Sequence, residues 1–232
     1  MSRRITLEWP SGVWKTTFAK MLEEEKVHRV WEFFHFLEPN EVYPTLNPRS
    51  QNELLKTRKR LLNLLKRREE FIGTLHGVDT LVIERSPLTY IYTELARKYH
   101  WFLTDICSLA RDLLQDYNTL MLPSSFYVFL EAPIPLLVQR VENREGKKTD
   151  AFFTDPMTLR IIYGILEVFR TDYLSVEQYS VISNNLRSLK DVSDRIKILL
   201  KSNLQNNMQD GVRELCVDIL KWRNLLHDIG LV

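Results

Sequence analysis

Cysteine, net charge and long apolar runs are all scarce in this sequence. Its 232 residues include only 2 cysteines, which are far apart and lack the spacing of metal ligands. We therefore expect a reducing compartment, cytosolic or nuclear, and no disulfide framework. The net charge of +2 is too small to indicate a nucleic acid polymer as partner. No apolar run approaches the ~20 residues of a membrane span, and the basic N-terminus leads directly into a strand-like segment, so neither a membrane span nor a cleavable signal is expected.

Glycine is missing at two critical positions of the segment "TLEWPSGVWKTTFAK", residues 6–20. Phosphate-binding loops follow the pattern G-x-x-x-x-G-K-[ST], in which backbone N–H groups and a lysine hold phosphates and the next hydroxyl binds Mg²⁺. Lys15 and Thr16 stand where the pattern needs them, but Trp9 and Trp14 occupy both glycine positions. A non-glycine residue in a left-handed conformation costs about 1–3 kcal/mol. The Trp14 indole would also fill space that a phosphate needs.

The rest of the sequence has the pattern of an α/β protein. A content of 44% hydrophobic and 27% charged residues is typical of one large globular domain. Short apolar runs predict strands at residues 4–9, 27–34, 79–86, 124–133 and 179–185. Amphipathic runs predict helices at residues 16–26, 51–72, 90–117, 135–143, 155–173, 188–202 and within 205–232. Strands that alternate with helices predict a three-layer fold, a parallel sheet covered by helices on both faces.

Two further segments carry charged residues where such a sheet binds ligands. Glu84 and Arg85 end an apolar strand, and parallel sheets bind their ligands at the carboxyl ends of the strands. Arg140 and Arg144 are four residues apart, on one helix face and beside a Gly-Lys-Lys loop. Arginines placed in this way can neutralise a phosphoryl group during its transfer. Each segment taken alone also fits a solvated strand end or helix end.

Together and in this order, "PSGVWKTT", "ERS" and "VFLEAPIPLLVQRVENREGKK" resemble three motifs of the deoxynucleoside kinase and thymidylate kinase superfamily, which includes the herpesvirus-type thymidine kinases. The resemblance covers about residues 3–202. It implies a P-loop kinase fold in residues 1–204, with a lid at about 140–155 and a C-terminal helical extension in 205–232. It also implies ATP and Mg²⁺ as cofactors, and a nucleoside or nucleotide as partner, with a homodimer as one option for the assembly.

The resemblance assigns roles to individual residues. The phosphates of ATP would lie on the loop, Thr16 would bind Mg²⁺, and Arg140 and Arg144 would close over the transferred phosphate. The loop residues are Ser11, Gly12, Val13, Trp14, Lys15, Thr16 and Thr17. Arg85 would contact the 5′ end of the acceptor, and Glu84 would organise the acceptor or a metal-bound water.

The general base and the base-reading residue follow from the same resemblance. Related kinases carry a carboxylate just after the second strand that acts as general base on the acceptor hydroxyl. Glu32 fits that place best, and Glu38 follows closely, because relatives often carry Glu-Pro there. Gln51 is the candidate for reading the edge of the base, although its distance from Glu84 matches no relative.

Two functions are therefore open. The first is ATP-dependent phosphoryl transfer to a (deoxy)nucleoside or nucleoside monophosphate, with thymidine or thymidylate as the favoured acceptor. The second is a kinase-fold subunit without catalysis that binds another protein. Trp14 supports the second, as does the C-terminal helix, although docking on the protein's own core is the favoured use of its apolar face. That face is formed by Leu215, Ile219, Trp222, Leu225 and Leu226.

Overall fold

The structure of the protein is a computed structural model that describes part of the chain. The described residues are 3–8, 27–30, 33–42, 44, 48, 50–100, 106–120, 126–143, 151–183, 191, 194, 195, 198 and 210–228. The strands are β1 (Arg3–Glu8), β2 (His28–Val30), β3 (Thr80–Glu84), β4 (Phe126–Glu131) and β5 (Tyr179–Ser183). The helices are η1 (Phe33–Phe36), α2 (Gln51–Thr74), α3 (Leu88–His100), α4 (Ile106–Leu120), α5 (Ile134–Glu142), α6 (Ala151–Thr154), α7 (Pro156–Asp172) and α9 (Gly211–Asp228).

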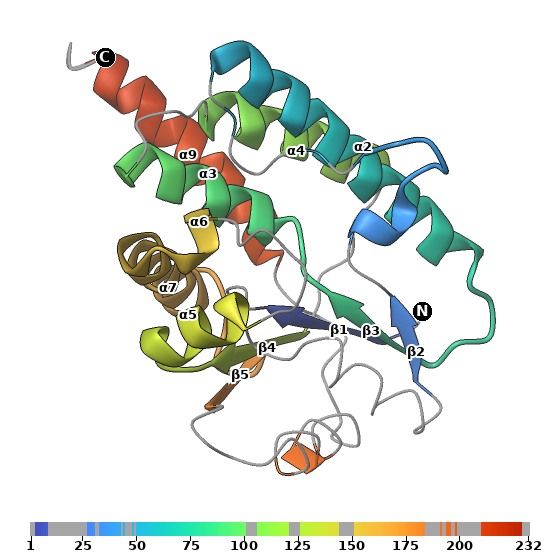
Figure 1. Cartoon of the computed structure of the whole chain (residues 1–232). Helices are drawn as coiled ribbons and strands as arrows, with labels where there is room; N and C mark the ends of the chain where they lie inside the picture. The colour runs from blue at the N-terminus through green and yellow to red at the C-terminus, as the bar shows by residue number, and fades with distance from the viewer. Residues whose placement is uncertain are drawn as a thin grey trace.

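The five strands form one parallel sheet in the order β2-β3-β1-β4-β5 (Figure 1). The apolar runs of β3 and β4 are buried almost throughout, as in parallel sheets that are covered on both faces. Alternate residues of β4 belong to two hydrophobic clusters: Phe126 and Val128 to one, Tyr127 and Phe129 to the other. Apolar side chains therefore pack on both faces of the sheet, and the predicted α/β fold class is confirmed.

Helices α2, α3, α4 and α9 gather above one face of the sheet (Figure 1). Helix α3 is buried along most of its length because its neighbours surround it. Helix α9 packs against α4, and Val212, Leu215 and Cys216 join the main hydrophobic cluster. The start of α9 thus docks on the protein's own core. Within the described part of the chain, every helix is too short or too polar to cross a bilayer.

Two element predictions were wrong in detail. The predicted helix at residues 90–117 is divided between α3 and α4, which pack against each other, as two parts of one straight helix cannot do. The predicted strand at 27–34 ends early: β2 stops at Val30, and Phe33 begins the 3-10 helix η1. The predicted helix at 16–26 lies outside the described residues, as does the one at 188–202 apart from four isolated positions.

Candidate functional site

The candidate site lies at the carboxyl edge of the sheet, around the end of β1. Strand β1 is central, with β3 on one side and β4 on the other, and Leu7 is in register with Glu84. The chain leaves β1 toward one half of the sheet and later crosses to the other half, so β1 marks the topological switch point where open α/β sheets bind ligands. Segment 9–26, which contains the predicted phosphate loop, follows directly from this point.

Glu8 ties the end of β1 to the start of α3. Its Oε2 accepts hydrogen bonds from the backbone N–H of Ser86 at 2.8 Å and from the Ser86 hydroxyl at 2.7 Å. Its Oε1 accepts from the Thr89 hydroxyl at 2.9 Å. Glu8 is fully buried, and this burial raises the pKa of its carboxyl above the ordinary range, although the hydrogen bonds and Arg85 act in the other direction. The strand that enters the loop is therefore fixed against the Glu84–Ser86 turn.

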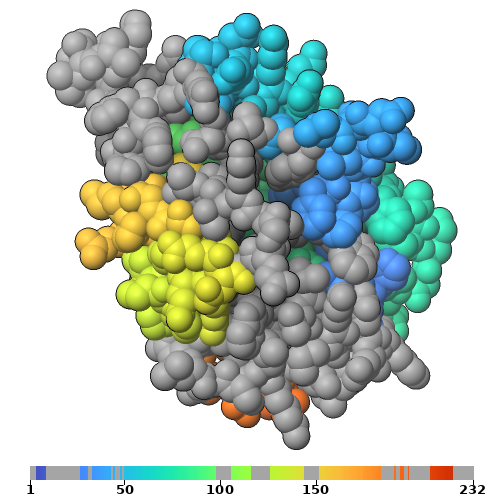
Figure 2. Space-filling view, in the orientation of Figure 1, coloured from blue at the N-terminus to red at the C-terminus, as the bar shows by residue number. Residues whose placement is uncertain are grey.

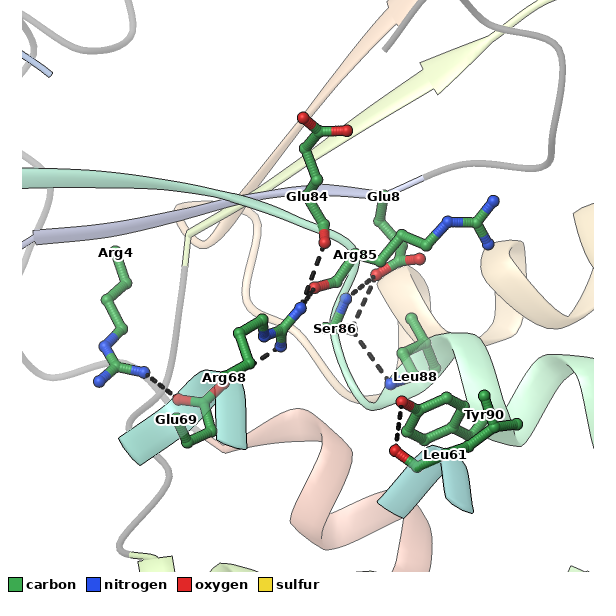
Figure 3. A network of polar contacts seen from close by, with 10 residues as sticks. All are labelled: Arg4, Glu8, Leu61, Arg68, Glu69, Glu84, Arg85, Ser86, Leu88 and Tyr90. Atoms are coloured by element: carbon green, nitrogen blue, oxygen red, sulfur yellow. Dashed lines mark hydrogen bonds and ion pairs between the residues drawn. The ribbon is translucent and has the colours of Figure 1, made fainter. Parts of the chain in front are cut away.

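Arg85 has a left-handed backbone conformation, with φ at 67°, which is uncommon for a residue with a side chain. Its N–H donates to the carbonyl of Leu7 at 3.1 Å, which continues the pairing of β3 with β1. Its guanidinium donates to the hydroxyl of Tyr92 at 3.3 Å, and burial raises the pKa of that hydroxyl. The conformation thus directs the Arg85 side chain toward the Glu8 end of the site (Figure 3).

Arg68, on α2, holds the same turn from the opposite side (Figure 3). Its Nη1 donates to two successive carbonyls, those of Glu84 at 3.2 Å and of Arg85 at 2.8 Å. Its Nη2 donates to Glu69, whose other carboxylate oxygen binds Arg4 of β1. A series of hydrogen bonds between Arg4, Glu69, Arg68 and the backbone therefore connects β1, α2 and the turn after β3.

Glu84 is paired with a residue that the sequence analysis did not single out. The Nε of Arg29, on β2, lies 2.8 Å from Oε1 of Glu84, and both side chains are buried. The charge of Glu84 is therefore balanced within the sheet. The role of Glu84 in organising an acceptor or a metal-bound water stays a prediction. In the structure its carboxylate is bound by Arg29.

The other predicted site residues lie in three different places. Arg140 is half-buried near the end of α5, which starts at the carboxyl end of β4, and burial lowers its pKa. Gln51 is exposed at the start of α2, 17 residues before Arg68 and so about 25 Å from it along the helix. The structure does not bring Gln51 to the Glu84–Ser86 turn. Glu38 is exposed and 3.9 Å from Arg67. Figure 2 shows α5 and segment 33–42 at the surface on one face of the molecule.

The remaining predicted site residues fall outside the described part of the chain. They are Ser11, Gly12, Val13, Trp14, Lys15, Thr16, Thr17, Glu32 and Arg144, together with Trp9. Their assignments stay predictions.

Sequence reasoning missed Glu8, Arg29 and Arg68, although one signal was present for all three. Each is an ionisable residue within an otherwise apolar pattern: Glu8 and Arg29 in strands, and Arg68 on the helix face of Leu61, Leu65 and Ile72. A charge placed among core positions needs a partner. The partners came from distant parts of the chain, so the sequence could not name them.

The fold agrees with those of solved kinases. A deoxyadenosine kinase from M. mycoides with bound dATP matches at a TM-score of 0.60 and 15% identity, covering 86% of this chain and 100% of that one. The same kinase with dCTP matches at 0.58 and 16%, again over 86% and 100%. A thymidylate kinase from Candida albicans matches at 0.57 and 13%, over 90% and 97%. The chain has the fold of the nucleoside and nucleotide kinases. No family model and no curated protein matches its sequence.

This kinase fold confirms, at the level of architecture, the resemblance inferred from the three motifs. With identities of 13–16%, the likeness concerns the fold alone. The residues that perform chemistry on this fold have to be argued from the site itself.

Proposed function

We propose that the protein transfers the γ-phosphoryl group of ATP to a (deoxy)nucleoside or nucleoside monophosphate, with thymidine or thymidylate as the favoured acceptor. The observation that carries this proposal is the position of Arg85. A buried arginine at the switch point of a kinase fold, beside the strand that leads to Lys15, suits the binding of an anionic or 5′-oxygen group. The kinase folds of the solved neighbours support the same reading.

In this proposal each predicted residue has one role. Lys15 and the backbone amides of residues 12–17 hold the ATP phosphates, and Arg85 binds the 5′ end of the acceptor. Glu32 accepts the proton of the acceptor hydroxyl, with Glu38 as the second choice. Arg140 and Arg144 offset the negative charge that develops on the transferred phosphoryl group. Gln51 is the weakest assignment, because α2 places it far from Arg85.

The ligands available to Mg²⁺ can be tested on the described carboxylates. Glu8 already accepts three hydrogen bonds from Ser86 and Thr89, and Glu84 is bound by Arg29. The described residues contain no cluster of three acidic, histidine or cysteine side chains that would hold a metal by themselves. This fits a magnesium ion that arrives with the nucleotide, bound by phosphate oxygens and the hydroxyl of Thr16. When bound, the ion would offset the negative charge of the phosphates.

A second function is favoured by specific features of this chain. Trp9 and Trp14 replace both loop glycines, and Arg29 takes up the carboxylate of Glu84. Both features suit a kinase fold that has become a non-catalytic subunit. Leu215 and Cys216 of α9 belong to the main hydrophobic cluster and Ile219 packs against it, so this part of the predicted partner face is used within the protein itself.

A direct transfer assay tests the proposed function. The native protein is incubated with ATP, Mg²⁺ and thymidine, thymidylate or the other deoxynucleosides and monophosphates, and products are identified by mass spectrometry. We expect phosphorylated product from at least one acceptor and none from a Lys15→Ala variant. If neither the native protein nor the Trp9→Gly/Trp14→Gly variant yields product, the non-catalytic subunit is the correct function.

A further inference from the structure

Arg68 is the most completely buried arginine at the candidate site. It lies on the apolar face of α2 and is 1% exposed. Its guanidinium carbon lies 4.1 Å from the centre of the Phe33 ring, so the cation rests on an aromatic face. Its donors are directed at the carbonyls of Glu84 and Arg85 and at Glu69. This arginine therefore contacts backbone groups and neighbouring side chains around the turn.

The turn that Arg68 holds contains the left-handed residue of the site. Residues other than glycine rarely adopt a φ near 67°, the value of Arg85. Such a conformation persists where surrounding contacts hold the backbone in place. Four hydrogen bonds fix the backbone here. The N–H of Arg85 donates to Leu7, the N–H of Ser86 donates to Glu8, and the carbonyls of Glu84 and Arg85 accept from Arg68.

The direction of the Arg85 side chain depends on this backbone conformation. Rotating φ of Arg85 back to a negative value would redirect either its side chain or the chain that continues to Ser86. Because Ser86 is held by Glu8, its hydroxyl and N–H cannot follow such a rotation without losing two hydrogen bonds. The guanidinium of Arg85 would then leave the hydroxyl of Tyr92.

We propose that Arg68 is the positioning residue for Arg85. It clamps the two carbonyls of the turn, keeps Arg85 left-handed and so sets the direction of the guanidinium that binds the acceptor. The part that concerns the acceptor rests on the proposed function, whereas the part that concerns the turn does not. Arginine suits this task better than lysine, because its planar group reaches both carbonyls and Glu69 while its central carbon lies over the Phe33 ring.

Amide hydrogen exchange tests the clamp without any activity. We expect Arg68→Met to speed exchange of the Arg85 and Ser86 amides by at least about tenfold more than exchange of the buried β4 amide of Val128. The comparison with Val128 removes any general loss of stability. The matched control is Arg67→Met, the adjacent arginine on α2, whose partners include Glu41, Glu38 and the carbonyl of Phe36. It should leave the Arg85 and Ser86 amides unchanged.

Glycine at position 85 separates the clamp from general packing. Glycine adopts a positive φ without cost, so the turn should no longer need Arg68 to stay left-handed. We therefore expect Arg68→Met combined with Arg85→Gly to return the Ser86 amide to within about threefold of its native exchange rate. Should Arg68→Met fail to fold, Phe33→Leu removes the ring beneath the guanidinium, which also contacts Tyr90, and should speed the same amides by about threefold. Equal acceleration at Ser86 and Val128, or no return in the glycine variant, would overturn the proposal.

Steady-state kinetics tests the part of the proposal that concerns the acceptor. If the protein phosphorylates an acceptor, Arg68→Met should raise the KM for the acceptor at least about tenfold and leave the KM for ATP near its native value. The double variant Arg68→Met/Arg85→Met should be no worse than Arg85→Met alone, because both changes remove the same interaction. Additive losses would contradict positioning. Absence of transfer activity in both the native protein and the Trp9→Gly/Trp14→Gly variant would refute the proposed function, and the exchange experiment would still decide the role of Arg68.

Discussion

Arg29 and Glu84 form an ion pair inside the sheet, between its edge strand β2 and the adjacent strand β3. The Arg29 Nε lies 2.8 Å from Oε1 of Glu84, and Nη2 binds the same oxygen. The two side chains are 2% and 1% exposed. Charges buried to this degree are tolerated because each compensates the other. The pair therefore fixes how the short strand β2 joins the sheet.

Replacing one member of this pair should destabilise the protein far more than replacing both. We expect Arg29→Met to lower the free energy of unfolding by about 3–5 kcal/mol, because Glu84 is left as an uncompensated buried charge. Arg29→Met with Glu84→Leu should recover most of that loss. Urea denaturation of the two variants measures both values. A double variant no more stable than the single one would show that the pair is not what stabilises β2.

Gly211 opens α9 at a point of close contact with the end of α7. A Cβ atom at this position would lie 2.6 Å from the carbonyl oxygen of Tyr173 and 2.8 Å from a methyl carbon of Leu174. Gly211→Ala should therefore cost about 1–3 kcal/mol through overpacking and lower Tm by several degrees. Gly164→Ala is the matched control, since open space surrounds Gly164 in the middle of α7. It should stabilise the protein by about 0.5–1 kcal/mol. Thermal denaturation showing the same sign for both would contradict this packing.

The stability of the folded protein should depend on pH through the titration of Asp210. Burial raises its pKa from 3.8 to about 6, although it accepts a hydrogen bond from the N–H of Arg213 at the start of α9. The folded protein therefore holds this proton more tightly than the unfolded chain. The stabilisation is complete below about pH 4 and is lost as the pH rises through 6.

Asp210→Asn removes this titration and keeps a side-chain oxygen that can accept the hydrogen bond. We expect the native protein to lose stability relative to the Asn variant between pH 4 and pH 7. Denaturation at several pH values measures the difference. A constant difference across that range would mean that Asp210 does not titrate as described.

Much of the fold could be predicted because apolar runs and turn residues report directly on strands and helices. The runs "TLVIE" and "FYVFLE" became β3 and β4 because a strand buried on both faces has to be apolar along its length. The boundary between α3 and α4 was missed, because both helices are apolar enough to be read as one continuous pattern. The end of β2 at Val30 was missed for a similar reason, since Phe33 and Phe34 suit a strand as well as η1.

The site could be predicted only where a motif carried it. Glu84 and Arg85 were found because a charged pair at the end of an apolar strand is a local feature. Arg29 and Arg68 were not found, because their roles depend on contacts with residues 55 and 16–17 positions away. The left-handed conformation of Arg85 was equally hidden, since arginine gives no sign of a positive φ.

The assignment of the general base makes a kinetic prediction. Glu32→Gln should lower kcat for phosphoryl transfer by about 10²–10⁴, the usual contribution of general-base catalysis. The KM for ATP should stay near its native value. Glu38→Gln is the matched comparison, because Glu38 is exposed and forms its ion pair with Arg67. If Glu38→Gln shows the loss and Glu32→Gln does not, the base is Glu38.

The binding of ATP is the central claim, and titration calorimetry tests it most directly. We expect the native protein to bind ATP with Mg²⁺ weakly, because tryptophan replaces the loop glycine next to Lys15. Trp9→Gly with Trp14→Gly should strengthen binding at least tenfold, or about 1.4 kcal/mol. That gain should vanish when Lys15→Ala is added, because the lysine supplies the charge that attracts the phosphates. Absence of binding in the native protein and in the glycine variant alike would contradict the account.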